Sequence, residues 1–279
     1  MSEDYQLLDS GDGRKYERFG AYTLVRPCSQ ALWRPTLSSA EWGCADASFD
    51  REDGNRWHGR GNLPKEWMIE TAGIRFRLGG TDFGHLGIFP EQRAQWQWIR
   101  ETVRAACANG RTVQALNLFA YSGGSTLAAA LGGAEVCHLD ASRGMVEWAR
   151  ENAVQNGLKD CPIRWIVDDA HKFMKREIRR GHKYDAIILD PPTCGRGAGG
   201  EMYKIERDLK ETLGLVADLL SPRPLFVLFS SHTPGLSPIV AENILGQLWP
   251  KAHLELGGML LGGRGGIGRA SGGERVEIS

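Results

Sequence analysis

A buried strand that runs through a glycine turn into a helix is the feature that most constrains how this chain can fold. The strand is the apolar run 113–118, and the turn is the stretch 119–124, Phe-Ala-Tyr-Ser-Gly-Gly. The Ala-rich stretch 125–131 that follows has the composition of a helix. Such a unit places backbone N–H groups and the positive end of a helix beside one crevice, where α/β sheets usually bind a nucleotide-like ligand.

A second apolar strand, residues 135–139, ends in Asp140. A carboxylate about 20 residues beyond a glycine turn can accept hydrogen bonds from both hydroxyls of a ribose. Because the turn lacks a G-x-G-x-x-G motif, it does not suit a dinucleotide, and a nicotinamide dehydrogenase is disfavoured. S-adenosylmethionine (SAM), which has a ribose and an adenine but no pyrophosphate, fits better. The alternative is a close-packed turn without a ligand, in which Asp140 caps the next helix.

Strands and helices alternate through the rest of the chain, which predicts an α/β protein with a Rossmann-like doubly wound sheet. Further strands are expected at 163–167, 184–189 and 225–229, and helices at 91–108, 142–156, 170–180, 201–220 and 238–248. The apolar residues near the end, at 254–261 and 276–278, predict a closing hairpin. We expect this sheet domain to span residues 84–279.

The N-terminal part, residues 1–83, is predicted to form a small β-rich domain. Residues 1–20 are polar and contain glycines, so a partly ordered lead-in is expected there. The stretches 66–71 and 74–78 predict a hairpin. Tryptophans and arginines alternate between them and the lead-in, a mixture that suits stacking on exposed bases, although burial of the tryptophans in the domain is favoured. These residues are Trp33, Arg34, Trp42, Arg51, Arg56, Trp57 and Arg60.

Composition excludes several classes of protein. The chain is 42% hydrophobic and 24% charged, as globular proteins are, and no apolar run approaches the roughly 18 residues that a membrane span needs. The six cysteines form no C-x-x-C pair, which argues against a structural metal and predicts reduced thiols in the cytoplasm. Net charge is zero, which gives no general support to a nucleic-acid partner. A basic run at 172–183 is interpreted first as a solvated helix face, with RNA contact as the alternative.

The strand 184–189 runs directly into Asp190-Pro191-Pro192. The two prolines hold the backbone in a rigid, extended turn that can aim the Asp190 carboxylate and nearby carbonyl groups at a flat acceptor. The glycine-rich stretch 195–200 behind it is flexible enough to close over a substrate. The alternative is a loop in which the prolines only stop the strand.

Taken together, these motifs resemble the class I SAM-dependent methyltransferases. They are similar in particular to the group related to the bacterial 23S ribosomal-RNA cytosine-C5 and guanine-N7 enzymes. The resemblance spans roughly residues 84–235 and rests on the segments 116–124, 140, 151–158, 168–170 and 190–193. It implies a methyltransferase sheet, SAM as the cofactor and an RNA substrate, with ribosomal RNA favoured and a part in its processing.

The resemblance also implies roles for individual residues. The glycine turn would hold the methionine part of SAM, Asp140 the ribose and Asp169 the adenine, with Asp168 as the competing assignment for the adenine. The full cofactor set is Phe89, Gln92, Arg93, Asn117, Phe119, Ala120, Tyr121, Ser122, Gly123, Asp140, Ala141, Asn156, Asp168, Asp169, Ala170 and Asp190. The catalytic set is Asp190, Pro191 and Pro192.

The chain departs from the group at the acceptor side. Cytosine-C5 enzymes need a cysteine nucleophile after the fifth strand, and Ser231 stands there, so C5 methylation is disfavoured. Thr193 and Cys194 replace the aromatic residue that many exocyclic-amine enzymes have. Asp190 could orient the acceptor or take its proton, with His232 ranked second. A methyltransferase for a small molecule or a protein, and a non-catalytic RNA-binding module, remain alternatives, and the oligomeric state is left open.

Overall fold

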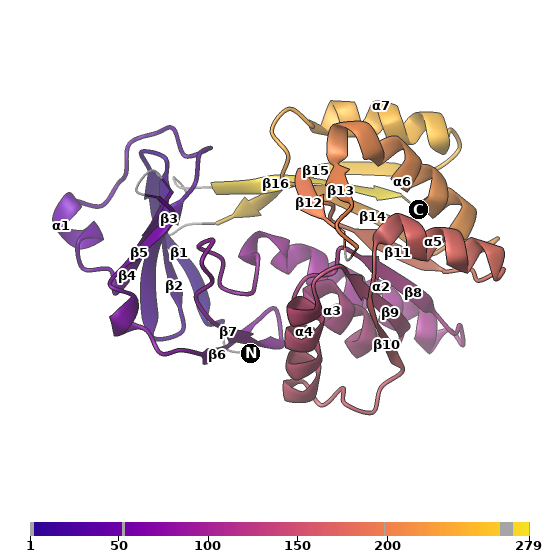
Figure 1. Cartoon of the computed structure of the whole chain (residues 1–279), viewed down its shortest axis with the longest axis horizontal. Helices are drawn as coiled ribbons and strands as arrows, with labels where there is room; N and C mark the ends of the chain where they lie inside the picture. The colour runs from indigo at the N-terminus through magenta and orange to yellow at the C-terminus, as the bar shows by residue number, and fades with distance from the viewer. Residues whose placement is uncertain (1–2, 52–53, 198, 263–269, 279) are drawn as a thin grey trace. The chain divides into compact units, whose positions relative to one another are not determined.

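The computed structural model describes residues 3–51, 54–197, 199–262 and 270–278. The chain divides into two compact units (Figure 1). Unit 1 comprises Met1–Arg93 and Leu260–Gly272, and unit 2 comprises Ala94–Met259 and Gly273–Ser279. The division into residues 1–83 and 84–279 stays a prediction.

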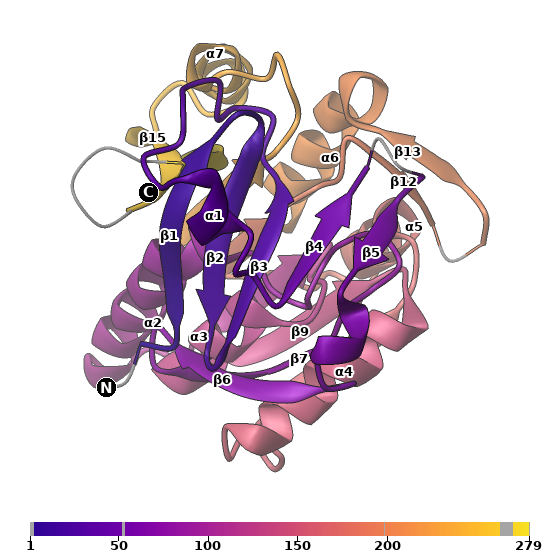
Figure 2. The same ribbon diagram turned by 90° about the vertical axis from the view of Figure 1, so that its left-hand side faces the viewer.

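Unit 1 is built on a five-stranded sheet in the order β1-β2-β3-β4-β5, which Figure 2 shows side by side. Its elements are β1 (Tyr5–Gly11), β2 (Arg14–Phe19), β3 (Tyr22–Pro27), α1 (Ser39–Trp42), β4 (Ala47–Asp50) and β5 (Arg56–His58). A short 3₁₀ helix, η1 (Arg60–Asn62), follows the last strand. The predicted hairpin is present as β6 (Trp67–Thr71) paired antiparallel with β7 (Ile74–Leu78).

The prediction of a partly ordered lead-in was wrong, because β1 and β2 pair antiparallel across a two-residue turn. Asp12 and Gly13 form that turn with φ of +49° and +74°. Positive φ at both central residues matches the right-handed twist of the flanking strands, so the glycine closes a hairpin. Along β1, Tyr5 and Leu7 are buried on one face of the sheet.

The tryptophans of unit 1 pack into it. Trp42 is buried, and its indole N–H donates to Asp9 Oδ2 at 3.0 Å. Trp57 is half-buried against Phe49, and its indole N–H donates to a backbone carbonyl. The favoured burial interpretation is confirmed for these two residues, which leaves their ring faces unsuited to stacking on RNA bases.

Unit 2 is built on the predicted doubly wound sheet. Its strand order is β10-β9-β8-β11-β14-β16-β15. The strands are β8 (Gln114–Leu118), β9 (Glu135–Asp140), β10 (Ile163–Val167), β11 (Ala186–Leu189), β14 (Phe226–Ser231), β15 (Leu254–Leu261) and β16 (Ala270–Ile278). The first five in the spatial order are parallel, and β16 is antiparallel to β14. The carboxyl ends of the parallel strands therefore share one edge, where such sheets bind ligands.

Helices cover both faces of this sheet (Figure 1). They are α2 (Arg93–Ala108), preceded by η2 (Pro90–Gln92), then α3 (Gly124–Gly132), α4 (Arg143–Gln155), α5 (Ala170–Arg179), α6 (Ile205–Leu219) and α7 (Pro238–Leu248). Leu116 and Leu118 of β8 belong to one core cluster with α5, α6 and α7. Asn117, between them, points to the opposite face and contacts α3.

A second hairpin interrupts the predicted pattern. β12 (Cys194–Arg196) pairs antiparallel with β13 (Met202–Lys204), and α6 begins only at Ile205. The prediction of a helix from residue 201 was therefore wrong for its first turn. The hairpin follows the Asp190-Pro191-Pro192 turn, so it extends from the functional edge of the sheet.

Candidate active site

The turn after β8 has an unusual backbone. Phe119 and Tyr121 have φ of +55° and +50°, a conformation that side-chain-bearing residues rarely adopt. Gly123, with φ of +94°, is the N-cap of α3 and has no side chain there. The first N–H groups of α3 therefore face the turn without a competing side chain, as a bound anion or carboxylate requires.

The backbone at Gly124 packs closely against Trp96 of α2. A Cβ added to Gly124 would lie 2.6 Å from Cε2 and Cζ2 of Trp96, whose side chain is 2% exposed. We therefore expect Gly124→Ala to lower the free energy of unfolding by about 1–3 kcal/mol, because the buried ring must shift. Urea unfolding measures this. Gly144→Ala is the matched control, since its Cβ would meet only Ser142 Oγ at 4.0 Å; equal stability of the two variants would contradict the prediction.

Asp140, at the end of β9, closes the turn from the side. Its Oδ2 accepts the backbone N–H of Tyr121, and its Oδ1 accepts that of Ser142, both at 2.8 Å. Burial raises the pKa of Asp140 above its ordinary value, and these two N–H groups oppose the rise. Each carboxylate oxygen can accept a second bond, so the pair of oxygens remains able to receive two hydroxyls.

Asp168 and Asp169 follow β10 at the same edge. Asp168 Oδ1 accepts the backbone N–H of Asp169 at 2.8 Å, and its other oxygen pairs with Arg176. Asp169 is the N-cap of α5, where its Oδ1 accepts the N–H of Lys172 at 2.9 Å. The ion pair with Arg176 occupies Asp168, which favours Asp169 for the adenine, and this assignment stays a prediction.

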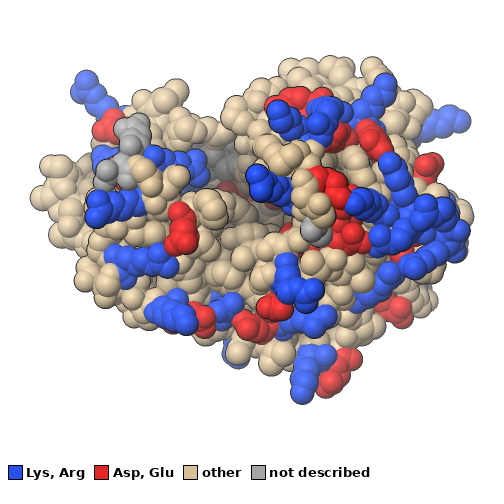
Figure 3. All heavy atoms as spheres, viewed as in Figure 1, with Lys and Arg blue, Asp and Glu red and all other residues tan. Residues whose placement is uncertain are grey.

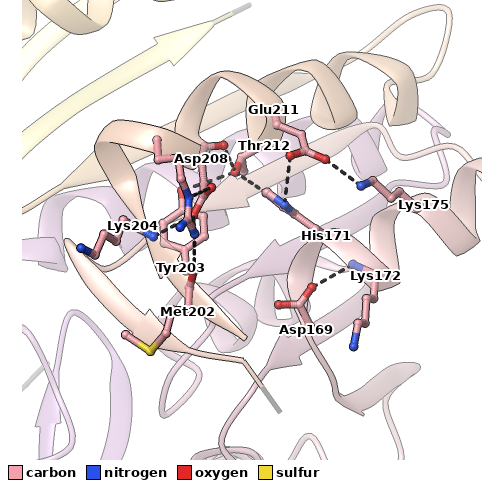
Figure 4. Close-up of polar contacts among 11 residues, drawn as sticks. Asp169, His171, Lys172, Lys175, Met202, Tyr203, Lys204, Asp208, Glu211 and Thr212 are labelled. Atoms are coloured by element: carbon pink, nitrogen blue, oxygen red, sulfur yellow. Dashed lines mark hydrogen bonds and ion pairs between the residues drawn. The ribbon is translucent and has the colours of Figure 1, made fainter. Parts of the chain in front are cut away.

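The β12–β13 hairpin lies against this part of the site. Figure 4 shows how its second strand contacts α5 and α6: the Tyr203 hydroxyl is 3.4 Å from Thr212 Oγ1, which is 2.7 Å from His171 Nε2. The Tyr203 ring packs on Phe119 of the glycine turn, with centroids 5.3 Å apart. Glu201 pairs with Lys172. The hairpin therefore contacts both the glycine turn and the start of α5, which no sequence motif had indicated.

Asp190 points toward β14. Its Oδ1 accepts the hydroxyl of Ser230 at 2.8 Å, and its Oδ2 lies 3.4 Å from His232 Nε2. Pro191 behind it is buried, whereas Pro192 is exposed. Ser231 is 1% exposed, and its hydroxyl accepts the N–H of Thr233. A buried, bonded hydroxyl is a poor nucleophile, so Ser231 is unsuited to the task that the cysteine has in cytosine-C5 enzymes.

A buried polar chain lies below the glycine turn. Asn117 donates to Thr126 Oγ1 at 2.9 Å, and that oxygen is 2.9 Å from His138 Nδ1. Burial lowers the pKa of His138 to about 3, and Arg150 adds to the effect, so the imidazole is neutral. The chain ties β8, α3 and β9 together, and it gives Asn117 a packing role beside its predicted cofactor role.

The other predicted residues have different surroundings. Asn156 ends α4 and donates to the Asn152 carbonyl, while Asn152 donates to the Ser122 carbonyl of the turn. Because α4 rises about 20 Å over its length, Asn156 lies far from Asp140 at the other end. Ala120 donates to β9, and Ala141 and Ala170 directly follow Asp140 and Asp169.

The segment predicted to line the SAM pocket belongs to unit 1. Phe89 is the N-cap of η2 and Gln92 is its last residue, and the Arg93 guanidinium pairs with Glu3 at 2.8 Å. Its place in the pocket stays a prediction. In the described ranges, no group of His, Cys, Asp and Glu side chains could hold a metal ion. The helices of that same part of the chain include none long and apolar enough to cross a membrane.

Lysines and arginines gather over α5 on the face shown in Figure 3. Most of this basic run is ion-paired: Lys172 with Glu201, Lys175 with Glu211, Arg176 with Asp168 and Arg180 with Glu177. Such pairing reduces the positive charge that could attract a phosphate backbone. Contact of this run with RNA stays a prediction.

Three kinds of comparison bear on this geometry. A family model described as S-adenosylmethionine-dependent methyltransferase matches residues 47–241. The ribosomal RNA large subunit methyltransferase K/L of Shewanella frigidimarina is 34% identical over 192 residues, which are 65% of this chain and 24% of that protein. Its namesake in Magnetococcus marinus is 31% identical over 175 residues, 60% and 22% of the two chains. The chain thus spans about a quarter of the length of these curated relatives.

A solved structure is similar over the whole chain. The crystal structure of the SAM-dependent methyltransferase from Agrobacterium tumefaciens superimposes with a TM-score of 0.92 at 36% identity. The match covers 100% of this chain and 91% of the other. The two chains therefore share the N-terminal sheet as well as the doubly wound sheet.

Proposed function

Because the chain belongs to the S-adenosylmethionine-dependent methyltransferase family, we propose that its methyl acceptor is a base of RNA, with ribosomal RNA favoured. The observation that carries the proposal is the 34% identity, over 192 residues, to a relative named for methylation of large-subunit ribosomal RNA. The predictions of a SAM-dependent methyltransferase and of a Rossmann-like sheet are confirmed. A cytoplasmic location, which methylation of ribosomal RNA would require, stays a prediction.

The residues at the glycine turn fit SAM. The turn from Phe119 to Gly123 offers backbone groups to the methionine part, and the Asp140 carboxylate lies beside it for the ribose. Asp169 begins α5 at the same edge of the sheet, where it can meet the adenine. When bound there, SAM supplies a methyl group that is already activated, so the protein mainly has to align the acceptor and exclude water.

The acceptor side has room for a base. A cavity of about 550 Å³ lies between α6, α7 and residues 233–236, which directly follow the strand β14. Thr233 in its wall is 2.8 Å, hydroxyl to hydroxyl, from Thr193 of the Asp190-Pro191-Pro192 turn. Leu209, Leu236 and Ile244 make its lining mainly apolar, as pockets for flat ring systems are. A mainly apolar cavity next to the Asp190 turn supports the RNA proposal, because it has room for a flat base.

Transfer of tritiated methyl groups from SAM tests the acceptor. We expect label in ribosomal RNA, released by ribonuclease and absent with protein or small aromatic acceptors alone. Digestion to nucleosides followed by mass spectrometry identifies the methylated base. Label in a small aromatic acceptor, with none in RNA, would replace RNA by a small-molecule substrate. SAM binding without transfer to any acceptor would favour a non-catalytic module.

A further inference from the structure

The β12–β13 hairpin is fixed to the first turn of α5. The N–H of Gly197 donates to the Glu201 carbonyl at 2.7 Å, which closes the hairpin. Glu201 Oε2 accepts the N–H of Gly199 at 3.0 Å, and the other carboxylate oxygen pairs with Lys172 of α5. Glu201 therefore links the hairpin to the helix that begins at Asp169.

The two carboxylate oxygens of Asp169 have different surroundings. Oδ1 accepts the N–H of Lys172 at 2.9 Å and so caps α5 (Figure 4). None of the described residues donates a hydrogen bond to Oδ2, which leaves this oxygen for an N–H group of a ligand. A Cβ added to Gly197 would lie only 2.7 Å from Oδ2. A ligand group that binds Oδ2 therefore has Gly197 as its neighbour.

Gly197 leaves free a space that any other residue would fill. The added Cβ would lie 2.8 Å from Glu201 Oε2 as well as 2.7 Å from Asp169 Oδ2, and both distances are shorter than van der Waals contact. The φ of Gly197 is outside the left-handed region, so the backbone itself would accept an alanine. What requires glycine here is the close approach of the hairpin backbone to the two carboxylates.

The second strand of the hairpin contacts the glycine turn. The Tyr203 ring packs on Phe119 with centroids 5.3 Å apart, and its centroid is 6.0 Å from that of His171 on α5. Phe119 is one of the residues with positive φ in that turn. One short hairpin thus contacts both the residue assigned to the adenine of SAM and the turn assigned to its methionine part.

We propose that the β12–β13 hairpin forms a wall of the cofactor site and that Gly197 is a specificity-determining position in it. Without a side chain, Gly197 leaves Asp169 Oδ2 accessible to the 6-amino group of adenine. A site built to accept a hydrogen bond from an amino group discriminates against a purine that lacks this group. The inference rests on the assignment of Asp169 to the adenine in the proposed function, and it is independent of the methyl acceptor.

The test compares two ligands that lack the amino-acid part of SAM. One is 5′-methylthioadenosine, and the other is its analogue with hydrogen in place of the 6-amino group. We expect the wild type to prefer the first by about 10- to 100-fold, as one hydrogen bond to a carboxylate allows. Calorimetric titration, with competition against S-adenosylhomocysteine for the weaker ligand, measures both affinities.

Gly197→Ala should reduce this preference to less than about threefold, because the added methyl group crowds Asp169 Oδ2. Its affinity for S-adenosylhomocysteine should fall by about 10- to 100-fold. Gly214→Ala is the matched control, since a Cβ at Gly214 of α6 meets nothing within 4 Å. It should keep both the affinity and the preference of the wild type. Urea unfolding checks that each variant is folded.

A second pair of variants tests the wall away from Gly197. Tyr203→Ala removes the contact with Phe119 and should weaken binding of S-adenosylhomocysteine by about 3- to 10-fold. Tyr203→Phe keeps the ring and should bind as the wild type does. This pair decides the question if Gly197→Ala does not fold, because wild-type affinity in Tyr203→Ala would overturn the proposal.

Two further results would also overturn it. Equal losses of affinity for the two purine ligands in Gly197→Ala would mean that Gly197 only shapes the loop. An unchanged preference in Asp169→Ala would remove the assignment of Asp169 to the adenine, and the proposal with it. No methyl acceptor is present in these titrations. If the wild type shows the expected preference but transfers no methyl group to RNA, only the RNA proposal fails.

Discussion

Replacement of Asp140 by alanine should weaken SAM binding by at least about 100-fold. Its carboxylate lies beside the glycine turn, and each charge-assisted hydrogen bond to a ribose hydroxyl contributes about 1.5–3 kcal/mol. Loss of two such bonds corresponds to a factor of about 100 or more. Calorimetric titration with SAM and with S-adenosylhomocysteine, on the wild type and on the variant, measures the change.

The controls separate ligand contact from turn geometry. Asp140 also accepts the N–H groups of Tyr121 and Ser142, so Asp140→Asn, which keeps the shape and one acceptor oxygen, should bind with intermediate affinity. Asp160→Ala changes an exposed aspartate and should bind as the wild type does. Wild-type affinity in Asp140→Ala would show that this residue only shapes the turn. If neither ligand bound the wild type, the assignment of the cofactor site would fail.

Glu177→Gln should lower the free energy of unfolding by about 2–3 kcal/mol at pH 7. The Glu177 side chain is fully buried on α5. It accepts two bonds from Arg164, at 3.0 and 3.2 Å, and one from the Tyr184 hydroxyl at 2.7 Å. His182 Nδ1 lies 2.8 Å from it. The guanidinium of Arg164 is half-exposed, so water can solvate it in the variant. The loss of folding stability is therefore smaller than for a fully buried ion pair.

The same substitution should change the dependence of stability on pH. Burial opposes ionisation of Glu177, but the hydrogen bonds from Arg164, His182 and Tyr184 lower its pKa to about 2 from the ordinary 4.5. A lowered folded-state pKa contributes stability that is complete above pH 4.5 and is lost as pH falls from there through 2. Urea unfolding at pH 7 and at pH 3 should therefore show a smaller difference between wild type and variant at pH 3. A stability difference that is the same at both pH values would contradict the assignment of the lowered pKa to Glu177. Glu147→Gln, at an exposed position, is the control and should match the wild type in stability at both pH values.

Local patterns in the sequence were sufficient for the sheet of unit 2. A mainly apolar run such as 113–118 is typical of a strand that is buried on both faces, and the glycine turn and Asp140 follow their strands within a few residues. The edge they form is then a consequence of parallel pairing. The Asp190-Pro191-Pro192 turn was also recognised from a local pattern. Its carboxylate and its two prolines are adjacent in the sequence, and they directly follow an apolar strand.

What was missed depends on residues far apart in the chain. Met202 to Lys204 has a composition compatible with a helix, and it forms a strand because Cys194 to Arg196 lies beside it. The direction of the Asp190 carboxylate depends on Ser230, which follows it by 40 residues. Thr126 and His138 likewise meet only after α3 packs on β9. The β1–β2 hairpin was missed for a simpler reason: its turn residues were interpreted as a sign of disorder.

The order of the strands separates two tasks within one sheet. The loops after β8, β9 and β10 carry most of the groups assigned to the cofactor, and those after β11 and β14 carry Asp190, which is assigned to both cofactor and acceptor, and His232. Mutations in the second set of loops, outside Asp190 and the β12–β13 hairpin, can therefore alter which molecule is methylated while the groups assigned to SAM remain intact. Proteins with this strand order can therefore change substrate by mutation of those parts of the loops after β11 and β14. The loops after β8, β9 and β10 would then stay similar among related proteins, because they bind the same cofactor.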